Sequence, residues 1–118
     1  MQNTTTSTTT TANIRKATTM QKTTTRNAEK NITRRDWEMD GYTLTIITFE
    51  NRSNRISIGC PLDGPELRVD DFKEEPEVQV NWSAIGNVGG DMARDYAAKI
   101  VAAADIAETF QEIIDILN

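Results

Sequence analysis

The sequence predicts an α+β domain: an antiparallel meander of about four strands followed by one long C-terminal helix, preceded by a disordered Thr-rich tail. Between residues 33 and 59, and again after residue 78, apolar and polar residues alternate, which is typical of strands with one buried face. From residue 91 onward apolar residues recur every three or four positions, as on one side of a helix. Residues 1 to 31 show neither pattern.

The N-terminal segment differs from the rest of the chain in charge and hydropathy. Residues 1 to 35 contain 13 threonines, and their seven basic residues and one acidic residue give a net charge of +6. Residues 36 to 118 carry six basic and 17 acidic residues, a net charge of −11, so the whole chain has −5. A segment with so few apolar residues cannot offset the entropy lost on ordering. We therefore predict a disordered basic tail over residues 1–31 and a small domain over 32–118.

A hairpin is predicted first in the domain. Asp40 and Gly41 separate two alternating runs, and an Asp-Gly pair in that position is a strong hairpin signal because both turn residues tolerate positive φ. We expect strands near 33–39 and 42–50, and a third strand over 55–59 after a polar turn.

The next stretch, residues 60–76, contains all three prolines of the chain and is predicted to be a loop with a short extended piece at 67–69. Val78, Val80 and Trp82 then alternate with polar residues, which predicts the fourth strand of the meander, with one face toward the core.

The long helix is expected to begin after Gly89 and Gly90, with Asp91 as its N-cap. Its main stripe is Tyr96, Ile100, Ala103, Ala107, Phe110, Ile114 and Leu117, and it is widened by Ala93, Ala97, Ala104, Ile106 and Ile113.

This helix is longer than the sheet beneath it. About 27 residues span roughly 40 Å, whereas an eight-residue strand spans about 26 Å. We therefore expect part of the stripe to stay exposed and to bind a partner chain, in the simplest case a second copy in a homodimer or other homo-oligomer. The predicted partner-binding residues lie in the C-terminal half of the helix: Ile106, Phe110, Ile113, Ile114 and Leu117. The alternative is a break near residues 104–105 that folds the last turns back.

Catalytic chemistry is not indicated by the composition. The chain has no histidine and one cysteine, which excludes histidine metal ligands, Ser-His-Asp and Cys-His groups and an internal disulfide. We predict no catalytic residue, no metal site and no cofactor. The acidic run around residues 70–77 is interpreted as a solvated loop or, alternatively, as a surface that imitates nucleic acid or docks a basic partner protein.

The junction between the fourth strand and the helix is a candidate ligand or partner loop. It contains Asn81, Ser83, Asn87, Gly89 and Gly90, and a helix N-terminus attracts anions. The loop lacks the Lys-Ser/Thr pair of a phosphate-binding P-loop, so a plain turn is the preferred interpretation.

The run from Val80 to Gly86, leading into an Ala-rich acidic helix, resembles small proteins encoded by bacterial phages and other mobile elements. The resemblance covers residues 78–107. It implies a genomic context, in which a host protein is a conceivable partner, and it transfers no functional residue.

These observations favour a non-catalytic binding or inhibitor protein that acts through protein–protein contacts and self-association. The alternatives are nucleic-acid association through the basic tail and nucleotide or other small-ligand binding at the strand–helix junction. With no run of 18 apolar residues and no secretory signal, we expect a cytoplasmic protein without membrane contact.

Overall fold

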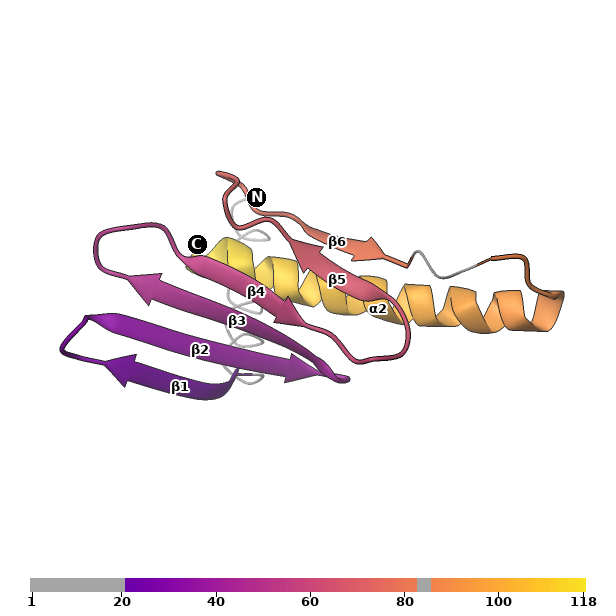
Figure 1. Ribbon diagram of the computed structural model, residues 1–118, viewed down its shortest axis with the longest axis horizontal. Helices are drawn as coiled ribbons and strands as arrows, with labels where there is room; N and C mark the ends of the chain where they lie inside the picture. Colours follow the sequence, from indigo (N-terminus) through magenta and orange to yellow (C-terminus); the bar gives the residue numbers. More distant parts are fainter. Residues whose placement is uncertain (1–20, 83–85) are drawn as a thin grey trace, which may run out of the picture.

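The computed structural model describes residues 21–82 and 86–118 and confirms the α+β fold class, with strands followed by one long C-terminal helix (Figure 1). The elements, in chain order, are β1 (Gln21–Asn27), β2 (Ile32–Met39), β3 (Tyr42–Phe49), β4 (Arg55–Gly59), β5 (Glu66–Val69), β6 (Val78–Asn81) and α2 (Gly90–Leu117).

The larger sheet is an antiparallel meander in the order β1-β2-β3-β4. The predicted hairpin joins β2 to β3, with Met39 paired with Tyr42 across the turn. Asp40 and Gly41 have φ values of 49° and 85°, the left-handed values that a two-residue hairpin turn requires. The sequence prediction of β2, β3 and β4 is therefore confirmed to within one residue at each end.

The first strand of this sheet corrects the predicted domain boundary. Residues 21–31, predicted from the sequence to belong to the disordered tail, form β1 and the turn into β2, with Thr25 paired with Arg34 and Arg26 with Thr33. Threonine is β-branched and fits an extended backbone, and an edge strand needs little apolar surface of its own. The remainder of the predicted tail, residues 1–20, lies outside the described residues.

The strand at residues 78–81, predicted as the fourth strand of the meander, belongs to a different sheet. β6 pairs with β5 in a separate two-stranded antiparallel sheet, in which Leu67 lies opposite Val80. The short extended piece predicted at 67–69 is thus the strand β5. The meander does have four strands, but its additional member is β1 and not β6.

Side-chain hydrogen bonds connect the two sheets. The Tyr42 hydroxyl donates to the Pro65 carbonyl at 2.5 Å, the Leu67 N–H donates to Cys60 Sγ at 3.3 Å, and the Ile56 N–H donates to Asp71 Oδ2 at 3.1 Å. These bonds satisfy polar groups at a junction where no backbone ladder runs between the sheets.

The helix is continuous from residue 90 to residue 117, so the alternative of a break near residue 105 is wrong. It packs most closely against β6 and also contacts β3 and β5. One hydrophobic core forms between the sheets and the C-terminal half of α2, and its buried members are Trp37, Tyr42, Leu44, Ile46, Ile56, Leu67, Ala103, Ile106, Ala107, Phe110, Ile113 and Ile114.

Part of the apolar stripe is exposed, as predicted, but the exposed part is in the N-terminal half of the helix and not in the C-terminal half. Phe110 has no exposed surface, Ile113 and Ile114 are 1% exposed, and Ile106 is 3% exposed, so four of the five predicted partner-binding residues are core residues of their own chain. Leu117, the fifth, lies in the last turn of the helix and is 36% exposed. It is instead the N-terminal half of α2 that extends past both sheets (Figure 1). We call residues 90–102 the arm.

Candidate functional site

The arm carries large apolar side chains that the rest of the described chain leaves exposed. Met92 is 51% exposed, Ile100 is 37% exposed and Val101 is 61% exposed. Met92, Tyr96 and Ile100 follow one another at intervals of four residues and continue the stripe that Ala103 and Ala107 bury in the core. We call these three residues the arm face. Val101 lies about 100° around the helix from Ile100 and belongs to a different side.

The arm meets the body of the protein at Trp82. The rings of Trp82 and Tyr96 lie edge to face, with centroids 4.8 Å apart and planes inclined by 72°. This geometry is favourable for aromatic pairs, and it fixes the middle of the arm against the chain that leads out of β6. Tyr96 is therefore half-buried, while its neighbours along the arm face remain exposed.

A polar groove of 460 Å³ lies at the root of the arm. It is lined by Leu62, Asp63, Gly64, Glu66, Asn81, Trp82 and Lys99. The Leu62 side chain is fully exposed at its rim. We call this the root groove. It combines an aromatic ring and an apolar side chain with charges of both signs.

The residues predicted for a ligand loop do not converge. Asn81 lines the root groove, whereas Asn87, Gly89 and Gly90 are exposed near the tip of the arm, where α2 begins (Figure 1). Ser83 lies outside the described residues. The helix N-cap is Gly89, with no side-chain hydrogen bond, and Asp91 lies in the first turn, where its carboxylate is 3.2 Å from Arg94. The predicted N-cap at Asp91 is therefore wrong by two positions.

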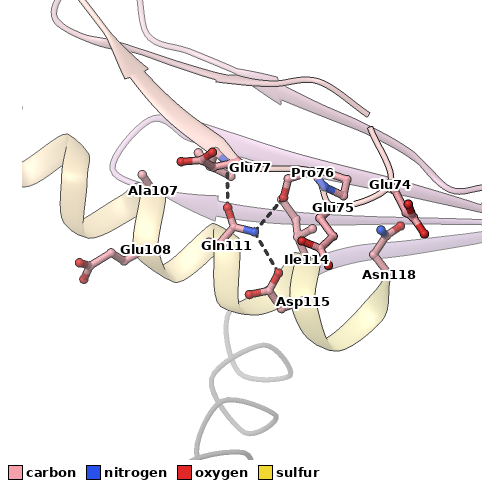
Figure 2. A pocket seen from close by; sticks show the side chains of 11 residues that line it. Glu74, Glu75, Pro76, Glu77, Ala107, Glu108, Gln111, Ile114, Asp115 and Asn118 are labelled. Carbon is pink, nitrogen blue, oxygen red and sulfur yellow. Dashed lines mark hydrogen bonds between the residues drawn. The ribbon is translucent and has the colours of Figure 1, made fainter. Parts of the chain in front are cut away.

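A second groove, of 640 Å³, lies between the β5–β6 connection and the C-terminal half of α2 (Figure 2). Its carboxylates come from both segments, and it also includes the apolar side chains of Val78, Ala107 and Ile114. The acidic residues that line this acidic groove are Glu74, Glu75, Glu77, Glu108 and Asp115. The acidic loop is apparent in the sequence, but its continuation on the helix is not. The seven-residue interval between Glu108 and Asp115, two helical turns, places both on one side and is the signal that could have revealed it.

Gln111 holds this groove together. Its amide oxygen accepts the Val78 N–H at 2.7 Å, and its amide nitrogen donates to the Pro76 carbonyl and to Asp115 Oδ1, both at 2.9 Å (Figure 2). One side chain thereby attaches the start of β6 to the helix. The acidic groove thus has a fixed shape along this side.

A third cluster, at the turn after β5, serves the fold. Burial raises the pKa of Asp71, but hydrogen bonds from Arg55 and from the Ile56 N–H, together with the charge of Arg55, outweigh burial and lower it below the usual value. The Arg55 guanidinium also lies 5.1 Å from the Phe72 ring centroid. Asp71 thus remains ionised and joins β4 to the end of β5.

Within residues 21–82 and 86–118, no group of three or more Cys, Asp or Glu side chains is arranged to hold a metal ion. No helix in these ranges has the length and apolar character to cross a membrane. Comparisons with protein-family models, curated proteins and solved structures gave no match.

Proposed function

We propose that the protein is a non-catalytic binding protein, of the kind encoded by phages or mobile elements, that acts through protein–protein contacts made by its arm. The observation that supports this proposal is the projection of half a helix, with Met92, Ile100 and Val101 exposed, beyond the sheets that bury the other half. Apolar surface held in water by a rigid element is characteristic of an interaction site.

The construction of the helix explains how such a surface persists. A free helix of fewer than about 12–15 residues is marginal in water. Here the C-terminal half is fixed in the core by Phe110, Ile113 and Ile114, so the helix is already nucleated where the arm starts. The alanines of the arm then favour continuation of the helix. The arm is therefore preorganised, which reduces the entropic cost of binding.

Contact with nucleic acid through the basic residues of the first 35 positions receives less support. The Arg26 guanidinium hydrogen-bonds the Thr33 hydroxyl and the Asn31 side chain, and Arg34 lies 3.3 Å from an Asp36 oxygen. These two arginines belong to β1 and β2 of the sheet and interact within it. Asp36 partly neutralises the charge of Arg34, and neutral oxygens occupy two donors of Arg26, whereas binding to phosphates depends on free cations.

The test is the recovery of binding partners on the tagged full chain from cells that carry its gene. A Met92→Glu variant places a charge on the arm face, and Val101→Glu places the same charge on another side of the same arm. We expect the wild type and Val101→Glu to retain the same partners and Met92→Glu to lose them. Equal recovery by all three proteins would show that the arm face is not the contact surface.

A further inference from the structure

We propose that a groove at the end of α2 remote from the arm binds a nucleoside phosphate, either a free nucleotide or one unit of a single-stranded nucleic acid. The groove has a volume of 770 Å³ and lies where the β3–β4 turn and the turn after β5 meet the helix C-cap, Asn118 (Figure 1). We call it the turn groove. None of the described residues of the arm lines it, so this proposal goes beyond the proposed function and does not depend on it.

Cations are concentrated at the turn groove. Residues 36–118 contain six basic and 17 acidic residues, and three of the six basic ones, Arg52, Arg55 and Lys73, line this groove. Arg52 and Lys73 are exposed, and neither forms an ion pair within the described part of the chain. Two cations on one groove are thus available to an anionic ligand, in a domain whose other surfaces are mainly acidic.

Two carboxylates also line the turn groove, but they do not cancel its cations. Asp71 lies 2.7 Å from the Arg55 Nε and its side chain is only 9% exposed, so Arg55 compensates its charge. Glu74 is exposed and also lines the acidic groove. Three cations against two carboxylates give the turn groove a net charge of +1, whereas residues 36–118 as a whole carry −11.

Aromatic rings accompany these cations. Phe72 lines the turn groove and is 82% exposed, and the Arg55 guanidinium lies over its ring, 5.1 Å from the centroid. Because Arg55 covers one face of the ring, the other face is open to a planar group. The Arg52 guanidinium lies 4.0 Å from the centroid of the half-buried Phe49 ring, and this contact orients Arg52 before any ligand arrives.

An oriented hydrogen-bonding group lies in the same groove. Asn54 Nδ2 donates to the Leu117 carbonyl at 3.1 Å, which fixes the amide against the end of α2. The Asn54 Oδ1 accepts no hydrogen bond from the described residues. An amide oxygen in this position can accept a hydrogen bond from the amino group of a base.

Together these features fit a nucleoside phosphate better than another anion. Single-stranded nucleic acids are held by stacking of bases on aromatic side chains and by contacts between cations and phosphates. A peptide rich in carboxylates satisfies the cations of the turn groove but offers no planar group to Phe72, and the same is true of inorganic phosphate. The volume of the groove, 770 Å³, is within the range of about 300–1,000 Å³ that small-ligand sites occupy.

The first measurement is calorimetric titration of the full chain at low ionic strength with adenosine monophosphate, uridine monophosphate and an oligothymidine of about eight nucleotides. We expect at least one of them to bind with a dissociation constant below about 1 mM. Binding of the mononucleotides identifies a free nucleotide as the ligand, and binding of the oligonucleotide alone identifies a single strand. Absence of binding by all three probes would overturn the proposal.

The second measurement tests stacking on Phe72. Phe72→Leu keeps an apolar side chain but removes the flat ring, and should weaken binding at least about fivefold. Phe72→Trp keeps a ring and should bind within about twofold of wild type. Leu62→Ala is the control, because it removes a fully exposed apolar side chain outside the turn groove and should leave binding unchanged. Circular dichroism establishes that the variants are folded. Unchanged binding by Phe72→Leu would contradict the stacking.

The third measurement tests the charges of the groove. Arg52→Gln and Lys73→Gln should each weaken binding and reduce the salt dependence, for the oligonucleotide by about 0.7 in the slope of log affinity against log salt concentration. Glu74→Gln removes a repelling carboxylate and should tighten binding about twofold. Arg68→Gln is the control, because this arginine pairs with Glu66 away from the turn groove. Equal losses in Arg68→Gln and Arg52→Gln would show that binding is not specific to this groove.

An acidic peptide is the competing ligand, and oligoglutamate with the same number of charges as the oligonucleotide measures it. We expect oligoglutamate to bind at least about fivefold more weakly, because it cannot stack on Phe72. Equal binding of the two polymers, with equal losses in Phe72→Leu, would assign the turn groove to acidic peptides and reject the nucleoside phosphate.

Discussion

The two halves of α2 belong to one unbroken helix and have opposite environments. Residues 103–117 supply six buried apolar side chains to the core, whereas Met92, Ile100 and Val101 in residues 90–102 are exposed. The apolar periodicity is similar in both halves. The size of the side chains differs: Ile and Phe dominate the C-terminal half and Ala the N-terminal half. Periodicity thus identifies the side of the helix that faces the core. The volume of the side chains on that side indicates which part of the helix packs against the sheets.

The largest expected difference between the halves is in stability. Phe110→Ala removes a fully buried ring and should lower the free energy of unfolding by about 3–5 kcal/mol. Val101→Ala, in the exposed arm, should change it by no more than about 0.5 kcal/mol. Urea denaturation of both variants, followed by circular dichroism, measures the two values. Similar losses would mean that the arm is covered within the single chain.

A smaller effect is expected from the hydrogen bonds that attach the C-terminal half to β6. Gln111→Ala leaves the Val78 N–H and the Pro76 carbonyl without their partner and should cost about 1–3 kcal/mol. Arg94→Ala in the arm removes only an exposed ion pair with Asp91, whose contribution is about 0–1 kcal/mol. Thermal unfolding of both variants compares them. A neutral Gln111→Ala would contradict the attachment of β6 through this side chain.

Acid should reveal a contribution from Asp71, which connects the two sheets against which the C-terminal half packs. The pKa of Asp71 is lowered in the folded state, so the stabilisation it provides is complete above the usual aspartate pKa and is lost as the pH falls through the lowered value. The unfolding midpoint of wild type should therefore fall more steeply between about pH 5 and pH 3 than that of Asp71→Asn. Parallel curves for the two proteins would show that this carboxylate does not contribute.

The smallest expected effect concerns the start of the arm. Gly89 is the N-cap, has an extended backbone with φ −70° and ψ 168°, and has open space where a side chain would begin. Gly89→Ser supplies the missing cap and should stabilise the first turn by a few tenths of a kcal/mol. Hydrogen exchange should then slow in the first turns of the arm and stay unchanged around Phe110. Uniform slowing along α2 would mean that the two halves open together.

The sequence predicts much of this fold because its signals are local. The Asp40–Gly41 turn, the β3 and β4 alternation and the length of α2 are each determined by neighbouring residues, and all are confirmed. The partner of β6 and the overhanging end of α2 depend on contacts between distant segments, so their prediction from local pattern was wrong. The acidic groove was missed for the same reason, since Glu77 and Asp115 are distant in the sequence and line the same groove only in the folded chain.

The junction between the two sheets depends on side-chain hydrogen bonds. Tyr42, Cys60 and Asp71 connect the meander to the β5–β6 hairpin through their side chains, in place of a shared ladder. Most substitutions leave the backbone atoms of a ladder in place, whereas the hydrogen bonds of this junction depend on individual side chains. We therefore expect substitutions at these three positions to alter the contact between the hairpin and the meander while both sheets keep their pairing.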